Sequence, residues 1–216
     1  MTGYGLALHT TTARLGLAVS EGGSSHPQAR VQTWPLGRSL SSELHGYLGE
    51  FIAPHRWQDL AFLAVAKGPG SFTGTRIGVV TARTLAQQLE IPLFARSSLE
   101  IMAEYRRQQD NRIPSDCDLA VQLMASRGQL FTAIYKPARK GQGLTTLVTD
   151  TARTFEDWTA LLNQWRSPYY LIKTDEDELA DSIPSLLDLA NQDYQEGRRP
   201  SWFQALPFYG QHPVER

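Results

Sequence analysis

The order of the predicted secondary-structure elements constrains the fold most, because the same order occurs twice. The first half has strands at 5–8, 14–19, 30–34 and 61–66, with helices over 39–52 and 73–89. The second half has strands at 118–124, 129–135, 144–149 and 169–173, with helices over 154–165 and 175–190. A strand at 92–95 and a helix from 97 to about 109 join the halves. The repeat favours two βββαβα lobes, 1–96 and 97–216, and another α/β domain with a mixed sheet is the alternative.

Side chains that cap or end helices set several of these boundaries. Ser39 is placed to cap the first helix, and Pro54 to end it. Ser97 and Glu100 have the spacing of a capping box, in which each side chain bonds the backbone N–H of the other residue. Pro184 is expected to interrupt the last helical stretch.

Composition and charge exclude several classes of protein. The formal net charge is −1, so no overall field attracts the chain to nucleic acid or to an anionic membrane. The longest purely apolar run, Leu60 to Ala66, is too short to span a bilayer. A single cysteine, Cys117, excludes an internal disulfide and a multi-cysteine metal site. We expect a cytoplasmic protein that does not contact membranes.

A glycine-rich loop follows the strand at 61–66, and two kinds of catalytic site could use it. Glycines between a strand and a helix can expose N–H groups to phosphate, but a P-loop needs Gly–Lys–Ser/Thr where this chain has Gly74, Thr75 and Arg76. A nucleophile elbow needs glycine two residues either side of serine, where Ser71 has Pro69 and Thr73. Both patterns are weak matches.

Packing is the third use of these glycines. Residues 74, 78, 82 and 86 are Gly, Gly, Ala and Ala, and four-residue spacing places them along one face of the helix. Glycine inside a helix costs about 1 kcal/mol relative to alanine, so close approach to another element is expected to offset it. That element is either the protein's own sheet or another polypeptide, and the sequence does not choose between them.

The segment Ala66 to Ala86, AKGPGSFTGTRIGVVTARTLA, closely resembles the signature of the bacterial TsaB (YeaZ) proteins. The likeness extends more weakly from the first strand to about Ala103, with a patch at 125–135. The resemblance implies a two-lobed fold of the actin-like ATPase and sugar-kinase (ribonuclease H-like) superfamily. The signature loop comprises Lys67, Gly68, Pro69, Gly70, Ser71, Phe72, Thr73 and Gly74.

The resemblance also implies a function. TsaB-like proteins are non-catalytic subunits that bind the catalytic TsaD subunit, self-associate when alone, and act with the ATPase TsaE. The complex forms threonylcarbamoyladenosine beside the anticodon of tRNAs, and tRNA is contacted only through the complex. The helices over 39–52 and 73–89 would bind the partner, with these candidate residues: Leu40, Leu44, Tyr47, Leu48, Phe51, Gly74, Ile77, Gly78, Thr81, Ala82 and Leu85.

Residues of catalytic relatives are missing where the resemblance places them. The stretch Ser97 to Ala103 has no histidine where TsaD-like proteins have His–x–x–x–His, so neither a metal nor another cofactor is expected. His9 stands at the end of the first strand where phosphotransferases of the superfamily carry aspartate, and Met124 to Arg127 replaces the common Asp–Ala–Arg. The sequence therefore predicts a divergent, non-enzymatic member.

Two other functions stay open. A stand-alone small-molecule kinase or ATPase of the same superfamily would account for the duplicated order and the glycine loop. An RNA-binding module would use the arginines of the chain, although no aromatic pattern accompanies them. Its candidate residues are Arg106, Arg107, Arg112, Arg198 and Arg199.

Overall fold

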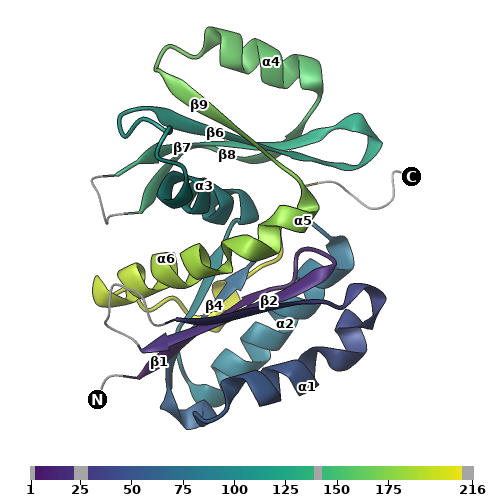
Figure 1. The fold of residues 1–216 in the computed structure, drawn as a ribbon, viewed down its shortest axis with the longest axis vertical. Coiled ribbons are helices and arrows are strands. Elements are labelled where there is room, and N and C mark those ends of the chain that lie inside the picture. Colours follow the sequence, from purple (N-terminus) through teal and green to yellow (C-terminus); the bar gives the residue numbers. More distant parts are fainter. Residues whose placement is uncertain (1–2, 22–28, 139–142, 211–216) are drawn as a thin grey trace.

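A computed structural model describes residues 3–21, 29–138 and 143–210, which form two sheets with helices between and outside them (Figure 1). The first sheet has the strand order β3-β2-β1-β4-β5. Its strands are β1 (Tyr4–His9), β2 (Arg14–Glu21), β3 (Arg30–Pro35), β4 (Leu60–Ala66) and β5 (Leu93–Arg96). β1 and β2, and β2 and β3, pair antiparallel, whereas β4 runs parallel to both β1 and β5.

The second sheet repeats the arrangement of the first four strands. Its order is β8-β7-β6-β9, and β9 runs parallel to β6 while the other pairs are antiparallel. The strands are β6 (Asp118–Met124), β7 (Leu130–Pro137), β8 (Leu144–Arg153) and β9 (Tyr169–Thr174). The duplicated βββαβα prediction is therefore confirmed.

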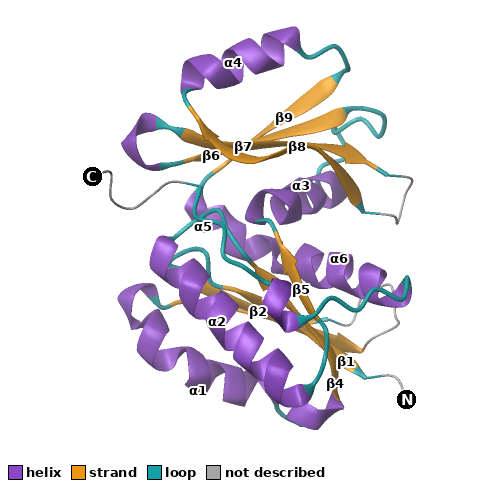
Figure 2. Cartoon of the chain, turned by 180° about the vertical axis from the view of Figure 1, so that it is seen from behind, coloured by secondary structure: helices purple, strands orange, loops and turns teal. Residues whose placement is uncertain are grey.

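Helices cover both faces of the first sheet. On the outer face lie α1 (Leu40–Ile52) and α2 (Phe72–Leu89), side by side (Figure 2). They bury one face each, because Leu44, Leu48 and Val79 are at most 2% exposed. The second sheet carries α4 (Phe155–Gln164) on its outer face, where Trp158 is buried.

Two helices lie between the sheets, and one of them comes from the second half of the chain but packs on the first sheet. α3 (Ser98–Gln109) follows the first sheet in the sequence but packs on β6 and β7. α6 (Ile183–Gln195), reached through the short α5 (Glu176–Leu179), packs on β1, β2 and β4 and also contacts α3. The division of the chain at residues 96 and 97 stays a prediction.

Three local predictions need correction. Ser39 lies in a 3-10 turn that runs directly into α1, so its backbone is already helical and its side chain caps nothing. Ser97 does cap α3, but Glu100 does not complete the box, because its carboxylate accepts a hydrogen bond from Arg96 instead. The predicted interruption of the last helical stretch is present, but it is the 3-10 turn Ala180–Ser182; Pro184 lies in the first turn of α6, where its missing N–H needs no partner.

Across the described ranges, no helix is long and apolar enough to cross a membrane.

Candidate functional site

The ridge of small residues on α2 faces the turn between β1 and β2. A Cβ on Gly74 would lie 2.1 Å from the carbonyl oxygen of Thr10, and one on Gly78 would lie 1.9 Å from Thr10 Oγ1. The Thr10 hydroxyl donates a 2.8 Å hydrogen bond to the Gly74 carbonyl, so helix and turn are joined at this point. The close approach that offsets the two glycines is therefore made within the chain, which is the first of the two alternatives that the sequence left open.

Most of the predicted partner-binding residues lie inside the first lobe. Only Tyr47, Ile77 and Leu85 keep partly exposed side chains, and they too pack on the core. The buried members are Leu40, Leu44, Leu48, Phe51, Gly74, Gly78, Thr81 and Ala82. The helices α1 and α2 could still bind a partner, but the residues that face outward from them are different ones.

The signature loop joins four parts of the molecule. The Ser71 N–H donates to Thr11 in the β1–β2 turn (2.7 Å), and the Gly68 carbonyl accepts from Ser98 at the start of α3 (2.9 Å). The Lys67 N–H donates to the Arg96 carbonyl in β5 (2.8 Å). The Lys67 carbonyl accepts from the Phe208 N–H (2.7 Å) in the C-terminal segment, residues 196–210. These contacts give the loop a packing role at the point where the four parts meet.

Gly70 shows why the loop needs glycine. Its φ of 152° lies in a region that side chains rarely adopt, and a Cβ there would come 2.2 Å from the Thr11 carbonyl oxygen. The side chain of Ser71 then caps α2 by accepting from the Gly74 N–H (3.3 Å). A serine engaged in this cap is poorly placed to act as a nucleophile, which agrees with the weak elbow pattern.

His9 ends β1 and is completely buried. Neither ring nitrogen has a hydrogen-bond partner among the described residues. Burial lowers the pKa of the His9 imidazole to about 3, so the ring is neutral at physiological pH. A neutral ring without access to solvent cannot replace an aspartate that holds a magnesium ion.

The start of α3 carries hydroxyl groups in place of metal ligands. Ser97 Oγ accepts from the N–H groups of Leu99 and Glu100, and Ser98 Oγ lies 3.2 Å from Thr11 Oγ1. Over the ranges that the structure covers, no group of three or more histidine, cysteine, aspartate or glutamate side chains could hold a metal ion.

The arginines proposed for RNA contact are held by the protein itself. Four of them form ion pairs with carboxylates: Arg106 with Glu178, Arg107 with Glu104, Arg112 with Asp110, and Arg198 with Asp193 and Glu196. The fifth, Arg199, donates to the carbonyl of Tyr194 and lies over its ring. These pairs favour solvated surface over an RNA site.

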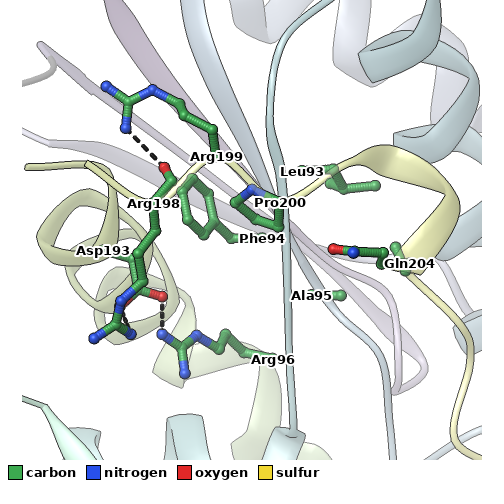
Figure 3. A pocket seen from close by; sticks show the side chains of 10 residues that line it. Leu93, Phe94, Ala95, Arg96, Asp193, Arg198, Arg199, Pro200 and Gln204 are labelled. Atoms are coloured by element: carbon green, nitrogen blue, oxygen red, sulfur yellow. Dashed lines mark hydrogen bonds and ion pairs between the residues drawn. The ribbon is translucent and has the colours of Figure 1, made fainter. Parts of the chain in front are cut away.

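A cavity of about 540 Å³ lies beside β5 at the edge of the first sheet (Figure 3). Asp193 of α6 reaches into it and binds both Arg96 and Arg198. Leu93 N–H donates to the Pro200 carbonyl (3.2 Å), so the C-terminal segment partly covers the strand edge. The lining carries three arginines and one aspartate, and the cavity lies where α6, β5 and the C-terminal segment meet.

Comparisons with known proteins agree with this architecture. The family profile described as "TsaD: tRNA N6-adenosine threonylcarbamoyltransferase" matches residues 53–179, more than half of the chain. The tRNA threonylcarbamoyladenosine biosynthesis protein TsaB of Bacillus subtilis (strain 168) is 41% identical over 118 residues, which are 55% of this chain and 48% of the relative. This match thus spans about half the length of that relative.

Two further comparisons cover more of the chain. The TsaB protein of Escherichia coli (strain K12) is 27% identical over 169 residues, 70% of this chain and 71% of the relative. The solved structure of YeaZ from Pseudomonas aeruginosa superposes with a TM-score of 0.72 at 20% identity, covering 96% of this chain and 99% of that one. At this identity the superposition supports the fold alone.

Fold and site define a two-lobed α/β protein of the actin-like ATPase and sugar-kinase (ribonuclease H-like) type. Within that class, the chain belongs to the TsaB (YeaZ) family.

Proposed function

We propose that this chain is a non-catalytic subunit in the formation of threonylcarbamoyladenosine on tRNA, and that it binds a TsaD-type catalytic subunit through the outer faces of α1 and α2. Both TsaB relatives described above carry this pathway in their names. A TsaE-type ATPase and tRNA join through the complex, and the net charge of −1 agrees with a partner supplying the phosphate contacts.

Two glycines in α1 carry the proposal. Gly46 and Gly49 are exposed and lie inside the helix, and a Cβ at either position would meet nothing within 4 Å. Each glycine therefore destabilises the isolated helix by about 1 kcal/mol relative to alanine with no compensating contact in the chain. Close approach of another helix offsets such a loss, since interaxial distance depends on side-chain size at the contact.

The neighbouring surface of α2 suits the same contact. Val80 is 58% exposed on the outer side of α2, and α1 and α2 pack directly against each other. Ser42, Gly46 and Gly49 are exposed and their spacing places them on one face of α1, and α1 lies beside α2 on the outside of the first sheet (Figure 2). The helix-interior glycines of α1 are the sequence signal for this face, whereas Gly74 and Gly78 of α2 are buried against Thr10.

The burial of His9 supports a non-catalytic role. Its ring nitrogens lie inside the protein at the position where phosphotransferases of the superfamily need a solvent-accessible acid. We assign the catalytic chemistry to the partner subunit and no cofactor to this chain. In the absence of that subunit, we expect the same face of α1 and α2 to pair with a second copy.

Leucine at Gly46 or Gly49 is expected to weaken the complex with the TsaD-type subunit of the same organism by about tenfold or more, because the side chain holds the helices apart. Size-exclusion chromatography and titration calorimetry measure this. Ala160→Leu, on the exposed outer side of α4, is the matched control and is expected to bind normally. Unchanged binding by both glycine variants would exclude α1 as the interface.

The alanine variants separate folding from binding. Gly46→Ala and Gly49→Ala are each expected to raise the free energy of unfolding of the isolated protein by about 0.5–1 kcal/mol, since alanine favours the helix and meets no neighbour. Urea denaturation followed by circular dichroism checks this. A loss of stability in either variant would show that the glycine has a role within the chain.

A further inference from the structure

A second cavity, of about 220 Å³, lies between the lobes and is lined by side chains of opposite charge. The signature loop, the start of α3, two strands of the second sheet and the C-terminal segment all contribute to it. The lining residues are Lys67, Ser97, Glu100, Tyr135, Thr146, Thr149, Asp150 and Phe208. Five separate segments thus bring a cation, two carboxyl groups and four hydroxyl groups to one space.

Lys67 supplies the positive side of this cavity. Its backbone is fixed on both sides, by β5 and by Phe208, so the base of the side chain has a defined position. In the part of the chain that the structure describes, its ammonium makes no hydrogen bond and no ion pair within 4 Å. Its charge nevertheless acts on both Glu100 and Asp150, so a gap of more than 4 Å separates the ammonium from the two carboxyl groups.

Asp150 and Glu100 supply the negative side. Asp150 Oδ1 accepts a hydrogen bond from the Tyr135 hydroxyl at 2.9 Å, and that hydroxyl lies 3.3 Å from Ser97 Oγ. Glu100 accepts from Arg96 at 2.8 Å, but Arg96 is shared with Asp193. Burial raises the pKa of both carboxyl groups, and the charge of Lys67 opposes this shift.

The charges select the ligand. A simple anion near Lys67 would lie within the field of two carboxylates, and a simple cation near Asp150 would meet the Lys67 ammonium. A molecule that carries both charges fills the gap without either conflict, because each of its ends meets the opposite sign.

We propose that this cavity binds a small zwitterion of the α-amino acid class, with its carboxylate toward Lys67 and its ammonium toward Asp150 and Glu100. Thr146 and Thr149 offer hydroxyl groups to a short polar side chain, and Phe208 offers an apolar surface. The site goes beyond the proposed scaffold role, because it lies between the lobes and α1 and α2 contribute nothing to it.

Titration calorimetry and two-dimensional NMR with three probes test this proposal. L-Serine carries both charges, lactate keeps only the carboxylate, and ethanolamine keeps only the ammonium. L-Serine is expected to bind, with amide shifts around residues 67, 97–100 and 146–150, and the other two probes at least about tenfold more weakly. Equal binding of lactate or ethanolamine, or no binding of L-serine at millimolar concentration, would overturn the zwitterion site.

Two variants test which side chain binds each charged end of the ligand. Lys67→Met and Asp150→Asn are each expected to weaken L-serine binding by about tenfold or more, since each leaves one ligand charge unpaired. Lys173→Met, on the exposed surface of β9, is the matched control and is expected to bind L-serine normally. Circular dichroism confirms that each variant is folded, and wild-type affinity in both cavity variants would refute the assignment. Complex formation with the TsaD-type subunit does not enter the measurement, so the two proposals fail independently.

Discussion

Replacing Gly78 with alanine is expected to destabilise the protein by about 3 kcal/mol or more, although alanine is the better helix former. The new Cβ would lie 1.9 Å from Thr10 Oγ1, 3.1 Å from Thr10 Cβ and 3.3 Å from Thr10 Cγ2. Either α2 moves away from the β1–β2 turn or Thr10 leaves its rotamer and loses its hydrogen bond to Gly74. Urea denaturation measures the loss.

A substitution at Thr10 tests whether its Oγ1 is the atom that excludes a side chain at position 78. Thr10→Ala removes Oγ1, the atom that Gly78→Ala would strike, so the alanine at 78 is expected to cost less than about 1 kcal/mol in that background. Gly74→Ala is the contrast, because its Cβ would strike the Thr10 carbonyl oxygen, which every residue at position 10 retains. Its cost is therefore expected to persist. If Thr10→Ala relieves neither variant or both, the assigned contacts are wrong.

His9 is expected to make the protein less stable as the pH falls below about 6.5. The folded-state pKa of the imidazole is about 3, against 6.5 for an unperturbed histidine, so the unfolded state binds a proton first. The contribution of neutral His9 to the free energy of unfolding is therefore fully present above about pH 6.5. It is lost as the pH falls from about 6.5 to about 3, at about 1.4 kcal/mol per pH unit. From pH 7 to pH 5 the loss from this one residue is about 2 kcal/mol.

Comparison with His9→Leu isolates this effect. The variant removes two buried ring nitrogens that have no partner among the described residues, so we expect equal or higher stability at pH 7 and a smaller loss toward pH 5. Other titrating groups are common to both proteins and cancel in the difference between their denaturation midpoints. His45→Leu, at an exposed position of α1, is expected to keep the wild-type slope. Parallel pH profiles for wild type and His9→Leu would show that His9 is not the cause.

Much of the fold could be predicted from the sequence, because strand and helix periods are local properties. The bounds of β6 and the ends of α2 and α3 agree closely with the apolar pattern and the capping residues. The packing of α6 on the first sheet could not be predicted, since hydrophobic periodicity identifies a buried face without identifying the element that covers it.

The candidate site was harder to predict for the same reason. The four-residue spacing on α2 located a face that needs close contact, but a glycine reveals nothing about which neighbour fills the space. The structure shows that Thr10 fills it. The predicted strand ends at residue 149, whereas β8 continues to Arg153 and includes Asp150.

The packing of α6 on the first sheet ties the two halves into one cooperative unit. A fragment cut after β5 would leave the sheet of the first half without α6 and expose Ala7, Ala18 and Ala64, which are at most 1% exposed in the whole protein. The complementary fragment would carry α6 with no sheet to cover. Although the architecture is duplicated, neither copy is self-sufficient, and heat or denaturant is expected to melt both together in a single transition.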